Sequence, residues 1–288
     1  MTSVLAPPSQ GSAPSGGPLF GAPAGRSAGL ADVVALTGRH LRHLRRTPEK
    51  IIAVALTPVA MVVILGYLFA SVVSIGGDTE YHDYVMAGVF TQVGLSCVGI
   101  TALGVASDLS KGLIDRFRSL PMARPAVLVS HTAADLVPAL ISMAAVGGVG
   151  LLVGWRIERG ILPALAGFAL LLAFAYAMLW LGALLGMVLR NMEAINGISA
   201  LVLVVFSFLS NSFMPLTGLP DWLRTVAEWN PVSSVSEACR VLWGNAPAAQ
   251  GGSLPVEHPV LVSVLTVGAM IAVLVPVCLR TFRTASVR

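Results

Sequence analysis

The chemistry open to this sequence depends on a few polar residues that lie inside long apolar runs. Asp135 follows His131 by one helical turn, a spacing that puts both side chains on one face of a helix. Such a pair either relays protons or lies near a helix end, satisfied by water or a partner helix. Polar residues within membrane spans are costly and tend to face cavities or neighbouring helices. On this ground the predicted candidates for a translocation path are Gln92, Asp135, Asn196, Ser207 and Asn211.

The sequence lacks the residue sets that would indicate catalysis. It has five histidines but no H-E-x-x-H motif and no paired nucleophile and base. The G-x-x-x-x-G-K-[S/T] loop that holds nucleotide phosphates is also missing from it. Its three cysteines lie far apart, with no CxxC and no metal-like Cys/His spacing. We therefore expect a chain that is not an enzyme by itself, binds no cofactor or metal, and has no disulfide framework.

The elements that position these polar residues must lie in a lipid bilayer. Hydrophobic residues make up 56% of the 288 positions and charged residues 11%, whereas soluble domains carry about 25% charged residues. Backbone groups in lipid must pair within their own segment, so runs that cross the hydrocarbon core should be α-helices. Such runs lie near residues 51–75, 84–106, 126–153, 162–189, 194–214 and 259–279. The predicted fold is an all-α integral membrane protein with six transmembrane helices.

The distribution of basic residues predicts the orientation of these spans. If both termini lie on one side, most of the 18 lysines and arginines fall on that side. Cytoplasmic loops carry an excess of Lys and Arg, so the N- and C-termini are predicted to be cytoplasmic. The basic residues adjoin apolar runs and do not form a polar surface interleaved with aromatics. The net charge of +4 therefore indicates membrane topology, with the lipid bilayer as a partner and no nucleic acid.

The chain is predicted to have three parts. Residues 1–29 are rich in Pro, Gly, Ser and Ala, which is typical of a disordered tail, here cytoplasmic. In residues 30–47 apolar residues recur at helical spacing opposite a face of arginines. This pattern predicts an amphipathic interfacial helix, which either only anchors the first span or also contacts a cytoplasmic partner. Residues 48–288 then hold the six spans.

Between the last two spans, a long segment of about residues 215–258 is predicted to lie on the extracellular side. It contains Trp222, Trp229 and Trp243, and indole side chains suit the membrane–water interface. The segment is therefore either a belt of interfacial anchors or a re-entrant or cap-forming structure.

A second amphipathic helix is predicted at about residues 108–121, in the loop between the second and third spans. Leu109, Leu113, Phe117 and Leu120 form its apolar face, charges of both signs form the other, and Pro121 ends it. A solvated loop that obeys the positive-inside rule would explain the charges. It would not explain why they lie opposite a large apolar face.

This loop resembles the coupling segment of ABC type-2 export permeases, especially the daunorubicin-resistance type of drug-export subunit. The similar pattern is Lys-Gly-Leu-x-Asp-Arg-Phe-Arg-Ser-Leu-Pro-x-x-Arg, residues 111–124. The stretch Met-Pro-Leu-Thr-Gly-Leu-Pro-Asp-Trp-Leu-Arg-Thr-Val-Ala-Glu-Trp-Asn-Pro at 214–231, followed by Glu-Ala-Cys-Arg at 237–240, is similar to the family's segment between spans five and six. The resemblance covers roughly residues 30–285.

The resemblance implies an exporter subunit that works with other chains. Permeases of this kind pair as homo- or heterodimers and bind two copies of a separate ATPase, which holds ATP and Mg. The resemblance assigns the coupling contacts to Lys111, Gly112, Leu113, Asp115, Arg116, Phe117, Arg118, Leu120, Pro121 and Arg124. Alternatively, these residues only set the membrane topology and pack at the membrane interface, and then they contact no ATPase.

The function implied is export of a hydrophobic or amphiphilic small molecule, such as a drug or antibiotic, across the plasma membrane of a bacterium. The same machine could instead move a lipid or a lipid-linked glycan. A proton-coupled secondary transporter is the other alternative, with Asp135 as its intramembrane carboxylate.

Overall fold

The computed structural model describes residues 48–69, 80–110, 124–189, 191–246 and 253–285. Within these ranges all regular structure is helical, which confirms the prediction of an all-α fold for this part of the chain. The elements are α2 (Pro48–Leu68), α3 (Tyr81–Ser110), α5 (Arg124–Val153), α6 (Ile161–Val188), α7 (Met192–Phe208), the short 3₁₀ helix η1 (Leu216–Gly218), α8 (Asp221–Glu228), α9 (Pro231–Trp243), α10 (Leu254–Glu257) and α11 (Pro259–Ala285).

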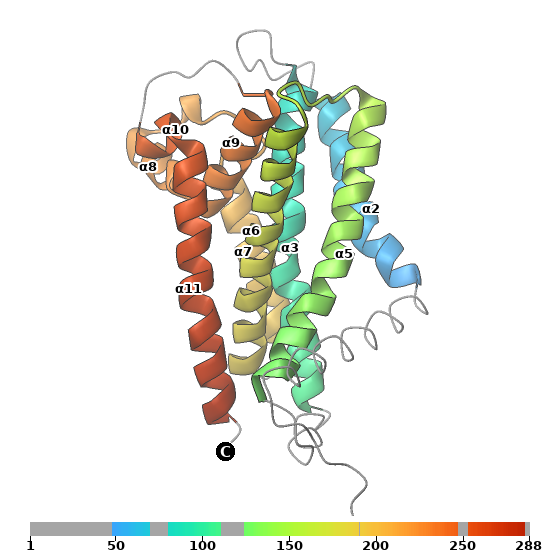
Figure 1. The fold of residues 1–288 in the computed structure, drawn as a ribbon, viewed down its shortest axis with the longest axis vertical. Coiled ribbons are helices and arrows are strands. Elements are labelled where there is room, and N and C mark those ends of the chain that lie inside the picture. Colours follow the sequence, from blue (N-terminus) through green and yellow to red (C-terminus); the bar gives the residue numbers. More distant parts are fainter. Residues whose placement is uncertain (1–47, 70–79, 111–123, 190, 247–252, 286–288) are drawn as a thin grey trace, which may run out of the picture.

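Four helices in the described ranges are long and apolar enough to cross a membrane. They are α3, the part of α5 at Thr132–Val153, α6, and the part of α11 at Pro259–Phe282. Two shorter apolar helices, Ala55–Leu68 within α2 and Met192–Phe208, accompany them. The long helices run side by side along the long axis of the molecule, and α8, α9 and α10 gather at one end, which we name the capped end (Figure 1). The C-terminal ends of α3 and α11 and the N-terminal end of α5 lie at the opposite end.

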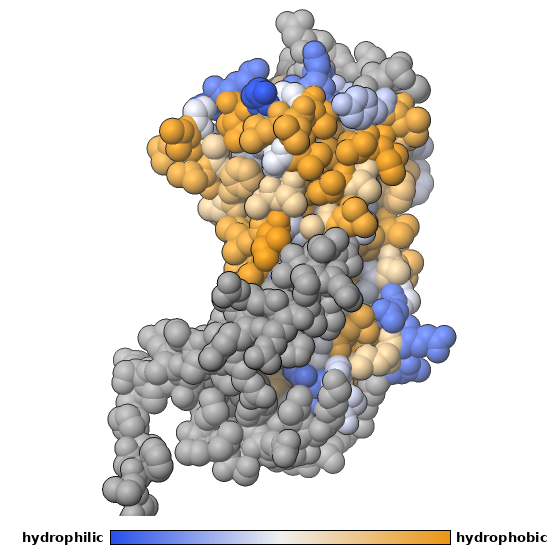
Figure 2. Space-filling view, turned by 90° about the vertical axis from the view of Figure 1, so that its right-hand side faces the viewer, coloured by the Kyte–Doolittle hydropathy of each residue, from blue (hydrophilic) through white to orange (hydrophobic). Residues whose placement is uncertain are grey.

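The outer surface of the bundle carries many exposed apolar side chains. Figure 2 shows mostly apolar residues across the described upper part of one face, with hydrophilic residues at its upper edge and again lower down. A surface of this kind suits contact with lipid tails. Large apolar side chains that are exposed on the long and the shorter apolar helices include Leu56, Ile64, Tyr67, Leu68, Leu152, Leu162, Leu165, Leu201, Leu265 and Val273.

Helix α3 lies at the centre of the bundle, and most of its apolar stretch is buried. Two glycines of α6 bring that helix directly onto its backbone. A Cβ atom added at Gly182 or Gly186 would lie 2.4 Å from the carbonyl oxygen of Val98 or Ala102. Small residues four apart allow such close approach in membrane bundles. Gly182 and Gly186 therefore let the backbones of α6 and α3 come into direct contact.

The predicted span at residues 194–214 is wrong in its length, because α7 ends at Phe208. The last carbonyls of a helix need partners, and Asn230 supplies them: its side-chain amide donates to the carbonyl oxygens of Phe206 at 3.0 Å and Leu209 at 2.5 Å. The same side chain accepts a hydrogen bond from the backbone N–H of Val232 and so begins α9. Hydropathy continues past Phe208, but a residue distant in sequence ends the helix.

The segment at residues 215–258 folds back against the bundle, as far as the structure describes it. Helix α9 packs against α3, α6 and α11. Its last residue, Trp243, is fully buried, with the rings of Phe90, Phe168 and Trp155 at centroid distances of 5.2–5.3 Å. Trp222 and Trp229, by contrast, are exposed. The three tryptophans thus divide between core packing and positions that suit a membrane interface.

Three predicted regions lie outside the described residues. They are the tail at 1–29, the amphipathic helix at 30–47, and almost all of the coupling segment. The first predicted span, at 51–75, corresponds to α2 as far as Leu68.

Candidate functional site

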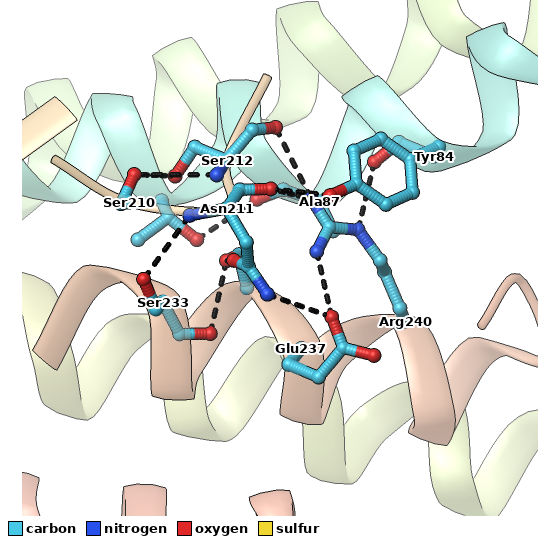
Figure 3. A network of polar contacts seen from close by, with 10 residues as sticks. Tyr84, Ala87, Ser210, Asn211, Ser212, Ser233, Glu237 and Arg240 are labelled. Atoms are coloured by element: carbon cyan, nitrogen blue, oxygen red, sulfur yellow. Dashed lines mark hydrogen bonds and ion pairs between the residues drawn. The ribbon is translucent and has the colours of Figure 1, made fainter. Parts of the chain in front are cut away.

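The capped end contains an arginine whose side chain is 0% exposed, Arg240 on α9. Its guanidinium donates four hydrogen bonds, drawn in Figure 3. Nε donates to the carbonyl oxygen of Tyr84 at 3.0 Å, and Nη1 donates to Oε2 of Glu237 at 2.8 Å. Nη2 donates to the carbonyl oxygens of Asn211 at 2.8 Å and Ser212 at 3.1 Å. The guanidinium carbon also lies 3.6 Å from the centre of the Tyr84 ring, a cation–π contact.

Asn211 lies in the middle of the same network and uses every polar group it has. Its amide nitrogen donates to Glu237 Oε2 at 2.9 Å, and its amide oxygen accepts from Ser236 Oγ at 2.7 Å. Its backbone N–H donates to Ser233 Oγ at 3.1 Å, and its carbonyl oxygen also accepts from the Tyr84 hydroxyl at 2.7 Å. We name Tyr84, Asn211, Ser212, Glu237 and Arg240 the arginine clamp.

The local fold explains why an arginine is needed here. Residues 209–214 are not helical, so their carbonyls lack the partners that a helix would provide. A guanidinium carries five N–H groups in a fixed planar fork and can serve several such carbonyls at once. The segment can lie on α3 because of Gly88, where an added Cβ would come within 2.0 Å of the Ser212 carbonyl oxygen.

The clamp joins α3, the end of α7 and α9, and its charge is balanced internally by Glu237. A buried cation without a counter-charge would be strongly destabilising. Because the clamp is paired and closed to solvent at Arg240, its role is to hold the capped end together.

A second polar contact lies deeper in the bundle, at Asp135. Counting 1.5 Å per residue, Asp135 lies roughly 16 Å along α5 from its first residue and roughly 27 Å from its last. The hydroxyl of Thr101, which is fully buried on α3, donates to Asp135 Oδ2 at 2.7 Å. The half-buried carboxylate faces a small pocket between α3, α5 and α6. Its other lining residues are Val93, Ser96, Cys97, Ile100, Ala139 and Leu179.

A third contact joins α7 to α3. The hydroxyl of Ser207 donates to the side-chain oxygen of Gln92 and to the carbonyl oxygen of Leu203, and both Ser207 and Gln92 are buried. Asn196 lies exposed on α7, about three turns before Ser207. The five path candidates thus fall in separate places, because the structure brings together only Gln92 and Ser207, while Asp135 pairs with Thr101 and Asn211 belongs to the clamp.

The predicted coupling residues at 111–121 lie outside the described part of the chain, and of Arg124 the structure gives only the backbone, as the first residue of α5. They connect the end of α3 to the start of α5. Both of these helix ends lie opposite the capped end (Figure 1).

Sequence reasoning included Arg240 in the stretch at 237–240 that resembles the family, but gave it no structural role. It gave no role to Glu237 in the same stretch either, and it did not single out Tyr84. A signal was available: Glu237 and Arg240 are three residues apart on α9, a spacing that lets opposite charges pair on a helix.

Long apolar helices with buried polar contacts between them define a multi-pass α-helical membrane protein. Its family is shown by comparison with known proteins: the chain belongs to the ABC-2 type transporter family, whose model matches residues 31–242.

Relatives with curated names agree with this family. The chain is 28% identical to the daunorubicin resistance ABC transporter permease protein DrrB1 of Streptomyces coeruleorubidus, over 90% of each chain. It is 25% identical to the probable doxorubicin resistance ABC transporter permease protein DrrC of Mycobacterium tuberculosis, over 89% of this chain and 90% of the relative. A more distant relative is the putative transport permease ycf38 of Porphyra purpurea, 24% identical over 75% of each chain.

Proposed function

We propose that this chain is the membrane-spanning permease subunit of an ABC exporter that moves hydrophobic or amphiphilic small molecules, such as drugs or antibiotics, out of the cell. The observation that carries this proposal is the family match over residues 31–242. The two relatives that cover about nine-tenths of the chain are named for daunorubicin and doxorubicin resistance, which supports the substrate class. ATP is hydrolysed by a separate subunit, which holds ATP and Mg.

In this proposal the chain crosses the plasma membrane of a bacterium six times, through α2, α3, α5, α6, α7 and α11. Both termini are cytoplasmic, with the tail at 1–29 in the cytoplasm and the helix at 30–47 on the inner membrane surface. The capped end is extracellular. The exposed indoles of Trp222 and Trp229 at that end suit a membrane–water interface, and the distribution of Lys and Arg supports this orientation.

The coupling helix at about residues 108–121 receives the movement of the ATPase. Two ATPase copies and a second permease subunit, identical or different, complete the transporter. Arginine and aromatic side chains dominate the binding energy of protein interfaces, which supports Arg116 and Phe117 as the main contacts. The position of the flanking helix ends, opposite the capped end, agrees with a cytoplasmic loop.

The test is reconstitution of the chain in liposomes with its candidate ATPase, followed by ATP hydrolysis and dye efflux. We expect both activities to require both proteins. The double change Arg116→Glu and Phe117→Ala should weaken ATPase binding by about 30-fold or more, the consequence of losing hot-spot contacts of about 2 kcal/mol. Arg280→Glu, which changes a basic residue of α11 at the same end of the bundle, is the matched control and should leave binding intact.

Transport without an ATPase would indicate a proton-coupled transporter instead of an ABC exporter. If the chain alone moves substrate when only a pH gradient is applied, the ABC proposal fails. Proton coupling through Asp135 then replaces it.

A further inference from the structure

We propose that the loop between α5 and α6 binds a phospholipid whose head group carries both a phosphate and a primary ammonium, as phosphatidylethanolamine does. The loop comprises residues 154–160 and lies at the capped end (Figure 1). This inference goes beyond the proposed function, because it concerns a lipid that holds the loop at the membrane surface and not the molecule that is exported.

The helix turns on both sides of this loop expose large apolar side chains. Leu152 in the last turn of α5 is 87% exposed, and Ile161 and Leu162 in the first turn of α6 are each 81% exposed. No other large apolar side chain of the described residues has so high an exposed fraction. Exposed apolar surface of this kind marks contact with a membrane or a partner protein. Lipid tails surround the helices of a membrane bundle, so lipid is the occupant that continues over these side chains.

Arg156 is held in place while most of its guanidinium stays available. Its Nη1 donates to the carbonyl oxygens of Leu151 at 2.7 Å and Trp155 at 2.8 Å. A guanidinium has five N–H groups, and those of Nε and Nη2 have no hydrogen-bond partner among the described residues. Two N–H groups in one plane match two oxygens of a phosphate. Arg156 is therefore the phosphate contact.

The backbone of the loop is fixed as well. Asn245 donates to the Arg156 carbonyl oxygen at 3.0 Å and accepts from Nε1 of the buried Trp155 at 3.1 Å. Two residues after Arg156, the backbone N–H of Glu158 donates to the Trp243 carbonyl oxygen at 2.8 Å. The loop is thus held against the end of α9 before a ligand arrives, and a preorganised site loses less entropy on binding.

The surface of the loop carries charges of both signs. Arg156, Glu158 and Arg159 are exposed, and none of them has an ion-pair partner in the part of the chain that the structure describes. More negative charge lies close by, because both Glu158 and Glu80 interact electrostatically with Asp83. These carboxylates repel a lipid of net negative charge. A head group with an ammonium beside its phosphate matches both signs, and this complementarity selects it.

The test measures lipid binding to the purified full-length chain in detergent by native mass spectrometry, which counts the lipid molecules that stay bound. Three lipids with the same acyl chains are added one at a time. They are phosphatidylethanolamine, phosphatidylglycerol, which lacks the ammonium, and phosphatidylcholine, whose ammonium has no N–H group. We expect phosphatidylethanolamine to bind most tightly. Equal binding of all three lipids, or none, would refute the proposal.

Arg156→Gln tests the phosphate contact. It should weaken phosphatidylethanolamine binding about tenfold, as expected for the loss of one charge-assisted hydrogen bond. Arg224→Gln is the matched control, because Arg224 lies at the same end but its Nε is already paired with Glu228 at 2.8 Å. It should leave lipid binding unchanged. If Arg156→Gln binds the lipid as the wild-type protein does, or if the control weakens binding equally, the site is wrong.

Glu158→Gln tests the recognition of the ammonium. It keeps the size of the side chain and removes its charge. The preference for phosphatidylethanolamine over phosphatidylglycerol should fall about threefold, the value of one exposed charge pair. An unchanged preference would overturn the assignment of the head group.

A last comparison tests the contact with the acyl chains. Glycerophosphoethanolamine has the same head group without acyl chains, and it should not displace the lipid at equal concentration. Leu162→Ser removes apolar surface and no charge, so it should weaken binding of all three lipids alike. Displacement by the free head group, or a variant with unchanged binding, would refute the contact of lipid tails with α6.

Discussion

Replacing Arg240 by methionine is predicted to destabilise the protein, because it removes the cation of the arginine clamp while keeping much of the apolar stem. Four hydrogen bonds and the contact with the Tyr84 ring are lost. Glu237 is left without its counter-charge. Removing one partner of a buried ion pair costs about 3–5 kcal/mol, and the side chain of Glu237 is 20% exposed, so water offsets part of this. We therefore expect the lower end, about 3 kcal/mol.

The assay is thermal unfolding of the purified protein in detergent, followed by tryptophan fluorescence. Trp243 is fully buried on the same helix as Arg240, three residues later, and reports on that helix. At about 2–4 °C per kcal/mol for a domain of 150–250 residues, the unfolding midpoint should fall by about 6–12 °C.

Two further variants identify the cause. Adding Glu237→Gln to Arg240→Met removes the unbalanced charge and should restore part of the lost stability. Arg156→Met is the matched control, because Arg156 also donates to carbonyl oxygens, those of Leu151 and Trp155, but is exposed. It should change stability by less than about 0.5 kcal/mol, as surface substitutions usually do.

The reasoning is refuted if Arg240→Met unfolds within 2 °C of the wild-type protein, a shift below about 1 kcal/mol. It is also refuted if the double variant is less stable than Arg240→Met alone. In that case the imbalance of charge would not be what destabilises the single variant.

Two more stability predictions use the same assay. Gly182→Ala should lower the free energy of unfolding by about 1–3 kcal/mol through overpacking, because its Cβ would lie 2.4 Å from the Val98 carbonyl oxygen. The control is Gly268→Ala on α11, where an added Cβ has nothing within 4 Å and should not destabilise the protein. Equal losses of stability in the two variants would contradict this. Asn245→Ala should lower the free energy of unfolding by about 1–3 kcal/mol. The Asn245 side chain accepts a hydrogen bond from Trp155 Nε1 at 3.1 Å and donates one to the Arg156 carbonyl oxygen at 3.0 Å, and the variant loses both. A variant as stable as the wild-type protein would refute this.

The class of the protein could be predicted from the sequence because the physics of lipid acts on each segment separately. A run such as 162–189 must be a helix in a bilayer whatever surrounds it, and α6 occupies almost that range. The close approach at Gly182 and Gly186 could be predicted for a similar reason, since small residues four apart form one smooth face on a single helix. The pairing of that face with Val98 and Ala102 could not.

Candidate polar residues could be selected from the sequence, but their partners could not. Asp135 was identified because a charge within an apolar run is rare. Its hydrogen bond with Thr101 and its pocket depend on how α5 crosses α3.

By itself, then, the sequence determined the helical membrane fold and its main polar candidates, because hydropathy and helical spacing are properties of local segments. Only the tertiary structure decided where α7 ends and how Arg240 is buried. Asn230 ends α7 by donating to Phe206 and Leu209, and Arg240 is buried among carbonyls of Tyr84, Asn211 and Ser212. These partners are distant in sequence, so only the folded chain brings them together. A charged side chain is stable in the interior when such groups pair with it and accept its hydrogen bonds.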